Sequence, residues 1–297
     1  MRLTLRHLIV FKTIVEQGTF RKSAEYLNIS QPALTVTIKG LETELGAAVF
    51  ERTTRSVRLT AAGRELYSHL GPIFDRLHRA FVSAKDAAAG LGGSISISYI
   101  DFAILGPLPQ ILLRYRAVNP NVRVEIAFEN SLSQIERVHD GSVDVGFILD
   151  SGVAMPKGVV RRTVTTEGLV AVLPPDHRLA GNGSIDLSEL ADEDFVMGDA
   201  FWQHFNDLIR GICLDHGFSP RIRQTALLRD ELLSFVTAGL GILVYPECIR
   251  NAPRFGLSMV PIRDVERFVS TQAIWREDST NPILSSLLNL VPSRLEK

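Results

Sequence analysis

The residues best suited to chemistry in this sequence lie on one helical face near the N-terminus. The stretch SQPALTVTIKGLE covers residues 30–42, and its outward side chains include an amide, a hydroxyl, a valine and one lysine. The amide of Gln31 can pair with N6 and N7 of adenine, the hydroxyl of Thr35 can bond either type of base or a phosphate, and Val36 suits a thymine methyl group. The face therefore predicts DNA contact through Ser30, Gln31, Pro32, Thr35, Val36 and Lys39, in which Gln31, Thr35, Val36 and Lys39 set which bases are accepted.

The element that must position these side chains is a short amphipathic helix. Ser30 is a preferred N-cap, and Pro32 falls in the first turn, where a missing N–H costs nothing. Leu34, Ile38 and Leu41 recur at i, i+4 and i+7 and form the inward stripe. At 100° per residue the outward face then carries Pro32, Val36, Lys39 and Thr43, with Thr35 beside them.

Two further short helices precede this one. Apolar residues at helical spacing run through LTLRHLIVFKTIVEQG and stop at Gly18, and Thr19 is a good N-cap for FRKSAEYL. Ala24 is small where the second helix must cross the third closely. Three short helices with a tight turn between the last two predict a helix-turn-helix.

An arginine-rich segment follows, in which VFERTTRSVRLT (49–60) reads as two extended arms around a polar tip. It contributes Arg52, Arg55 and Arg58. Such a run is commonly only a solvated face, but phosphate contacts flank helix-turn-helix motifs and their affinity term is electrostatic. Residues 1–60 hold 9 basic and 5 acidic residues, whereas the whole chain has a net charge of −1, so the first sixty residues are the expected site of a polyanionic partner.

Residues 61–89 predict one long helix with a near-heptad stripe. Its apolar positions are Leu66, Leu70, Ile73, Leu77 and Phe81. The stripe favours a helix–helix partner, with docking on its own domain as the alternative. Gly71-Pro72 predicts a bend, and the small residues AAAGLGG (87–93) predict a hinge. The expected domains are 1–60, a linker helix at 61–90, and 91–297.

From Ser94 onward strands and helices alternate. SISISYI, VRVEIAF and the almost unbroken apolar VDVGFIL read as strands separated by helices, which predicts a parallel α/β sheet. The pattern resumes after residue 165 with LVAVLP, a helix around WQHFNDLIRGICLDHGF, RIRQTA, and DELLSFVTAGLG running into ILVYP. VSTQAIW and the helix ILSSLLNLV are expected to return to the first lobe. The predicted lobes are therefore 91–164 with 267–297, and 165–266.

A second candidate site is expected between these two lobes, where ligands of such sheets lie beyond the strand ends. The strands end at Asp101-Phe102, at Asn130-Ser131 and at Leu149-Asp150. Phe201 and Trp202 are candidate walls contributed by the second lobe. End-of-strand aspartates can equally cap the next helix, and that alternative stays open.

These motifs resemble the LysR-type bacterial transcriptional regulators over the whole chain. TFRKSAEYLNISQPALTVTIKGLETELGAAVFERTTRSVRLTAAG resembles the family's winged helix-turn-helix, and LPQILLRYRAVNPNVRVEI, GSVDVGFI, AVLPPDHRLA and FVTAGLGILVYP resemble its effector-binding domain. The resemblance is closest to the branch that senses aromatic catabolites. It implies a two-lobed domain similar to type 2 periplasmic binding proteins, a dimer-forming linker helix, homotetramers on promoter DNA, and RNA polymerase as a further partner.

The resemblance also places the site residues and marks departures from the family. Many relatives carry Arg-Gln where this chain has Val36-Thr37, so a bidentate guanine contact does not carry over. Ser131 stands where aromatic-acid sensors grip the ligand with Ser or Thr. Phe102 replaces a hydroxyl residue and Leu149 an arginine that holds a carboxylate in some relatives. With Asp101 and Asp150 adding negative charge, an aromatic or weakly acidic effector is favoured over a dicarboxylate.

Three other functions are less consistent with the sequence than a ligand-responsive regulator. A redox regulator would switch through Cys213 and Cys248, but both fall in apolar contexts typical of inert thiols. An enzyme is disfavoured, since the seven histidines show no metal-ligand spacing and no nucleophile or phosphate-binding motif occurs. A periplasmic receptor would need a signal peptide. The sequence thus predicts a cytoplasmic regulator without metal, cofactor or membrane partner.

Overall fold

The computed structural model describes residues 3–51, 57–88, 92–253, 256–266, 268–279 and 281–292. The chain divides into two compact units, residues 1–81 and 82–297, which are described separately. In the described residues no helix is both long and apolar enough to cross a membrane.

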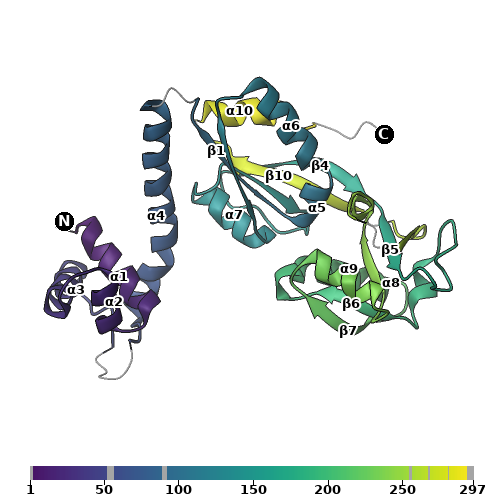
Figure 1. Ribbon diagram of the computed structural model, residues 1–297, viewed down its shortest axis with the longest axis horizontal. Helices are drawn as coiled ribbons and strands as arrows, with labels where there is room; N and C mark the ends of the chain where they lie inside the picture. Colours follow the sequence, from purple (N-terminus) through teal and green to yellow (C-terminus); the bar gives the residue numbers. More distant parts are fainter. Residues whose placement is uncertain are drawn as a thin grey trace. The chain divides into compact units, whose positions relative to one another are not determined.

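The first unit begins with three short helices, α1 (Leu5–Gln17), α2 (Phe20–Tyr26) and α3 (Gln31–Leu45) (Figure 1). Thr19 Oγ1 accepts from the amide of Lys22 at 3.2 Å, and Ser30 Oγ accepts from the amide of Ala33 at 3.3 Å. Helices α1 and α3 end at Gly18 and Gly46, each at φ +72°, a conformation that glycine adopts without steric cost. The expected caps therefore set these helix boundaries.

The core of this unit forms around the predicted inward stripe of α3. Leu34, Ile38 and Leu41 are all buried and belong to one cluster with Phe11 and Ile14 of α1. Ala24 is buried where α2 joins the same cluster. The period of the α3 sequence was thus sufficient to predict which face turns inward.

Two extended arms follow α3 and pair with each other. Phe50 and Leu59 form an antiparallel bridge, and the amide of Glu51 donates to the carbonyl of Arg58 at 2.8 Å. This pairing matches the two arms expected of a wing. The tip, residues 52–56, lies outside the described residues.

Helix α4 (Ala61–Ala88) carries the expected apolar stripe and continues through Pro72 without interruption of the helix. Leu70 is fully buried in the first unit's core, and Leu66, Tyr67 and Phe74 pack against it. Farther along, Phe81 is 64% exposed. The stripe is therefore buried at its start and open to solvent toward its end.

The first lobe of the second unit is built on a five-stranded sheet in the order β2-β1-β3-β10-β4. The strands are β1 (Ser94–Tyr99), β2 (Arg123–Phe128), β3 (Val145–Leu149), β4 (Val159–Glu167) and β10 (Val269–Arg276). The first three pair in parallel as predicted, but β10 runs antiparallel to both β3 and β4. The sheet is mixed because the chain returns from the second lobe in the opposite direction.

Both faces of this sheet are covered. Helices α6 (Leu108–Val118) and α10 (Pro282–Leu288) lie on one face, and α7 (Ser131–His139) on the other (Figure 1). Along β3, Val145 and Phe147 belong to the core beneath α6, whereas Ile148 packs with Ile135 of α7. This alternation explains why the β3 sequence is apolar at every position.

The second lobe consists of a three-stranded sheet, β8-β5-β9, and a two-stranded one, β6-β7. Its elements are β5 (Leu169–Leu173), β6 (Asp194–Gly198), β7 (Arg221–Ala226), β8 (Leu243–Pro246), β9 (Ser258–Pro261), α8 (Gln203–Asp215) and α9 (Arg229–Thr237), with short 3-10 turns η1 (Leu187–Leu190), η2 (Ala200–Trp202) and η3 (Glu247–Asn251). A parallel bridge between Phe195 and Ile242 links the two sheets. The strands β4, β6 and β9 had no counterpart in the sequence prediction.

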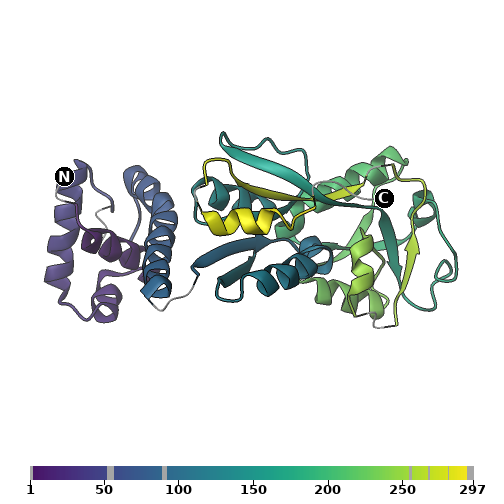
Figure 2. The ribbon, with the colours of Figure 1, turned by 90° about the horizontal axis from the view of Figure 1, so that it is seen from above.

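The chain passes between the lobes twice, from β4 into β5 and from β9 back into β10. Figure 2 shows β4 and β10 side by side where they leave the first lobe, in agreement with their antiparallel pairing. The last strand, β10, therefore belongs to the sheet of the first lobe.

Candidate functional site

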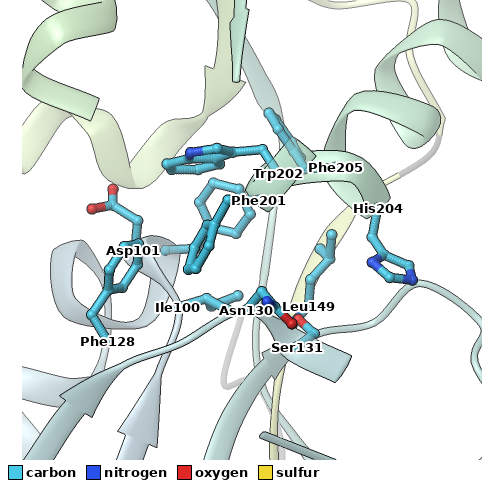
Figure 3. Close-up of a pocket in the computed structure, with 11 residues that line it drawn as sticks. Ile100, Asp101, Phe128, Asn130, Ser131, Leu149, Phe201, Trp202, His204 and Phe205 are labelled. Atoms are coloured by element: carbon cyan, nitrogen blue, oxygen red, sulfur yellow. The ribbon is translucent and has the colours of Figure 1, made fainter. Parts of the chain in front are cut away.

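A pocket lies between the two lobes of the second unit, with about 350 Å³ of space that is partly open to solvent (Figure 3). Its lining residues come from the strand ends of the first lobe and from η2 and the start of α8 in the second. They are Ile100, Asp101, Phe102, Phe128, Asn130, Ser131, Leu149, Phe201, Trp202, His204 and Phe205.

The fold brings these residues together through three strand ends and one helix start. β1 runs directly into α5 (Asp101–Leu105), β2 ends at Phe128 just before Asn130, and β3 ends at Leu149. Parallel strands present their carboxyl ends at one edge of a sheet. The turn η2 then presents Phe201 and Trp202 from the other lobe toward that edge (Figure 3).

Aromatic rings make up most of the pocket wall. Phe102 packs edge-on against Phe205, with ring centroids 4.8 Å apart, and against Trp202 at 5.9 Å. Phe128 and Phe201 pack across the lobes at 4.9 Å. The indole N–H of Trp202 donates to the carbonyl of Leu227 at 2.7 Å, which fixes that ring. Such a wall suits a flat, apolar ligand surface.

Ser131 provides a polar group at the opposite end of the wall. It is buried, and its Oγ accepts from the amide of Leu149 at 3.2 Å, so its hydroxyl proton can be donated to a ligand. Asn130 caps α7 by accepting from the amide of Ser133 at 3.0 Å. The remaining amides of this helix start favour a ligand oxygen or a negative charge.

Asp101 lines the pocket but is held by two residues of the second lobe. Arg229 Nη1 donates to Oδ1 at 2.8 Å, and Tyr245 Oη donates to Oδ2 at 2.6 Å. Burial raises the pKa of Asp101, while the hydrogen bond from Tyr245 and the charge of Arg229 act in the opposite direction. Burial alone would lower the pKa of Arg229, but the charges and hydrogen bonds of Asp101 and Asp230 make the net shift upward. The negative charge that the sequence placed here is therefore compensated.

Asp150 does not line this pocket, although the sequence placed it at the same edge. Its Oδ2 accepts from Gln272 Nε2 at 2.7 Å, and its Oδ1 lies 3.7 Å from Arg161 Nη1. Both partners belong to the first-lobe sheet, on β10 and β4. The carboxylate is thus engaged beside the pocket rather than in it.

Four lining residues, Ile100, Phe128, His204 and Phe205, were not predicted from the sequence. Phe128 ends β2, so the rule used for the other strand ends could have identified it. Phe205 lies three positions after Trp202 on α8, which is the spacing that places two side chains on one helical face. His204 carries no comparable signal in the sequence.

In the first unit, the outward face of α3 is open to solvent. Val36 is 69% exposed, and Gln31, Pro32, Lys39 and Ser30 are exposed as well. Thr35 is half-buried, and its hydroxyl donates to the carbonyl of Gln31 at 3.0 Å. Its oxygen therefore remains available as an acceptor, as is typical of threonine within a helix.

Of the three predicted arginines, only Arg58 lies among the described residues, and it is exposed on the second arm of the wing. Arg52 and Arg55 fall in 52–56, outside those residues. The two cysteines lie in the second unit and are both buried. Burial raises the pKa of Cys213 to about 11, and burial together with Glu167 raises that of Cys248. Neither thiol has the low pKa or exposure of a redox sensor.

No metal site is apparent in the described parts of the chain, since no three His, Cys, Asp or Glu side chains gather in a way that could hold an ion.

Comparison with known proteins identifies two family models that together span almost the whole sequence. The "Bacterial regulatory helix-turn-helix protein, lysR family" model matches residues 5–64, and the "LysR substrate binding domain" model matches residues 88–296. The chain is similar to the transcriptional regulator IlvR of Caulobacter vibrioides, with 31% identity over 97% of each chain. It is also similar to the regulator BenM of Acinetobacter baylyi, with 30% identity over 88% of this chain and 86% of BenM.

Solved structures of full-length regulators share the fold. The crystal structure of CbnR, a LysR family regulator, has a TM-score of 0.80 at 23% identity and covers 97% of this chain and 98% of its own. Full-length BenM has a TM-score of 0.61 at 27% identity, covering 97% and 95%. The chain belongs to the LysR family and is a DNA-binding transcriptional regulator with an effector-binding domain, not an enzyme.

Proposed function

We propose that this regulator binds promoter DNA sequence-specifically through α3 and the wing, and that a small aromatic or weakly acidic effector in the pocket between the lobes modulates that binding. The observation that carries the effector proposal is the aromatic pocket itself, which lies at the strand ends expected from the sequence. The exposed outer face of α3 supports the DNA proposal.

On DNA, the start of α3 is the end expected to meet base edges. Gln31 pairs with adenine, and the oxygen of Thr35 accepts from the amino group of adenine or cytosine, because its proton is engaged with the Gln31 carbonyl. Val36 contacts a thymine methyl group. Lys39 lies on the same base-reading face. Ser30 and the predicted arginines Arg52, Arg55 and Arg58 supply contacts to the phosphates.

In the pocket, the effector lies against Phe201, Trp202 and Phe102, and its polar group meets Ser131 and the start of α7. None of the described residues that line the pocket carries an amino or guanidinium group. A ligand with two carboxylates would leave at least one of them without a cationic partner in a partly apolar site, which is costly. The lining therefore favours an aromatic ligand with one weakly acidic group over a dicarboxylate.

The exposed part of the α4 stripe supports a homodimer formed through this helix. Ile73 and Phe81 are exposed, and a groove that includes Phe81 is lined by residues of α1, α4 and the end of α2. Apolar patches of this kind mark association surfaces. Two such dimers would give the tetramer expected of the family, with RNA polymerase as the further partner. Effector binding then shifts the population of assembly states on DNA, with Gly92 and Gly93 absorbing the rearrangement.

Isothermal titration of the full-length protein against aromatic monocarboxylates, neutral aromatics and aliphatic dicarboxylates tests the effector class. We expect an aromatic acid to bind, and Ser131→Ala to weaken it by about tenfold through loss of one hydrogen bond. Asp150→Ala is the matched control, because that side chain does not line the pocket, and it should leave affinity unchanged. Tight binding of a dicarboxylate would overturn the proposed class.

A further inference from the structure

The buried acid Asp101 connects the two lobes of the effector domain directly. Its side chain starts from the first lobe, and both of its oxygens accept from second-lobe donors, Arg229 at 2.8 Å and Tyr245 at 2.6 Å. These residues are 128 and 144 positions away in the sequence. The contact therefore exists only when the lobes are packed as they are here.

The network is enclosed rather than displayed on the surface. The side chains of Asp101 and Arg229 are 12% and 17% exposed, and Tyr245 is fully buried. The ring of Tyr245 packs against Phe102 at 5.1 Å, next to Asp101 in sequence. Arg229 Nη2 also contacts Asp230 at 2.9 Å from the solvent side. Enclosed pairs of this kind are costly to break, because the remaining charge is left without compensation.

Asp150 shows that this connection is a property of Asp101 and not of any acid at a strand end. The carboxylate of Asp150 contacts Gln272 and Arg161, which both lie in the sheet that carries it. Of these two acids, only Asp101 crosses to the other lobe. Asp101 also lines the pocket, on the side opposite His204 (Figure 3).

A guanidinium and a phenol that donate to the two oxygens of one carboxylate form a set of donors suited to binding acids in general. We propose that Arg229 and Tyr245 form a carboxylate-binding site between the lobes, and that the chain fills this site with its own Asp101. The resident acid holds the lobes together without a ligand. One consequence rests on the proposed effector role of the pocket: the effector does not need to supply a carboxylate to hold the lobes together.

Removal of the Asp101 side chain should therefore create a vacant site for a small carboxylate. In full-length Asp101→Ala, we expect the Tm to fall by about 5 °C or more. Acetate or formate, compared with chloride at equal ionic strength, should restore a large part of this loss, whereas the neutral isostere acetamide should not. Asp101→Ala combined with Arg229→Met should lose the response to acetate.

Two controls, Asp150→Ala and the unmodified protein, make the result decisive. Asp150→Ala removes a neighbouring acid that stays within one lobe, so acetate should affect it no more than it affects the unmodified protein. An equal acetate response in all these proteins would overturn the proposal.

A double-mutant cycle with Asp101→Asn and Arg229→Met covers the case in which Asp101→Ala does not fold. We expect the combined variant to lose clearly less stability than the sum of the two single losses; strictly additive losses would contradict the proposal. These assays contain neither effector nor DNA, so their failure leaves the proposed function untouched, and failure of effector binding leaves this inference untouched.

Discussion

The outer face of α3 and the wall of the interlobe pocket differ in how much their residues contribute to the core of their unit. Val36 is 69% exposed and contributes little to the core of its unit, whereas Phe102, Trp202 and Phe205 are 3%, 7% and 6% exposed and belong to the main core of the second unit. Residues on the helix face can therefore be substituted to suit another DNA sequence without loss of stability. The pocket wall can change only together with the packing of its domain.

This difference separates two kinds of substitution. A change on the α3 face should alter binding and leave the free energy of unfolding almost unchanged. A change in the pocket wall should alter both, and the relative size of the two effects depends on how deeply the side chain is buried.

The largest effect is expected for Phe102→Ala. The ring contacts Trp202, Phe205 and Tyr245, so its removal opens a cavity that links the lobes. We expect the free energy of unfolding to fall by about 3–5 kcal/mol, measured by urea denaturation. Phe201→Ala is the matched control, since that ring is only half-buried. It should lose less stability than Phe102→Ala, while the two variants should lose a comparable share of effector affinity. Equal stability losses would remove the distinction.

Val36→Arg tests the other side of the comparison. An arginine can contact guanine with two hydrogen bonds, and a valine cannot. The binding free energy should therefore shift in favour of guanine at the contacted position by about 1–3 kcal/mol in a DNA selection experiment. The free energy of unfolding should change by less than about 0.5 kcal/mol, as is usual for exposed positions. Unchanged base preference would contradict the assignment of Val36 to a base contact.

Ser30 combines both roles, and two substitutions separate them. Ser30→Ala removes the cap that accepts from Ala33 and should lower the free energy of unfolding by about 1 kcal/mol. Ser30→Asp keeps a capping oxygen but adds a negative charge, so it should preserve stability and weaken DNA binding. If Ser30→Asp binds DNA as well as the unmodified protein, this helix end does not approach the phosphates.

Local sequence pattern predicted the helices other than α5 and most strands, because each of these has a clear period or a cap. Leu34, Ile38 and Leu41 established the inward face of α3, and the uniform apolar character of residues 145–149 indicated a strand covered on both sides. The strands β4, β6 and β9 were missed. β4 is amphipathic with two adjacent arginines, and β6 (DFVMG) and β9 (SMVP) lack the unbroken apolar run of β3 and β5, so none has a distinct local signal.

Contacts between distant segments could not be predicted from the sequence. The strand-end rule identified Asp101, but its partner Arg229 starts α9 in the other lobe, and only the packing of the lobes brings the two together. For the same reason Asp101 and Asp150 look alike in the sequence and have different surroundings in the fold. The charge at position 101 was therefore predicted, and its compensation was not.

The smallest effect is expected at the two cysteines. Burial raises the pKa of Cys213 to about 11, and that of Cys248 is raised as well, so both thiols stay protonated near neutral pH. We expect neither to react with a thiol reagent in the folded protein, both to react after unfolding, and peroxide to leave the mobility on non-reducing gels unchanged. Rapid labelling of either thiol in the folded protein would contradict this prediction and support the redox alternative.

The proposed effector pocket and the proposed DNA-reading helix belong to different units, and DNA footprinting with and without an aromatic acid tests their coupling most directly. We predict that an acid which binds the full-length protein changes the footprint or the affinity for selected DNA, and that Phe201→Ala loses this response while it keeps DNA binding. An acid that binds tightly in the pocket and changes neither would contradict the account.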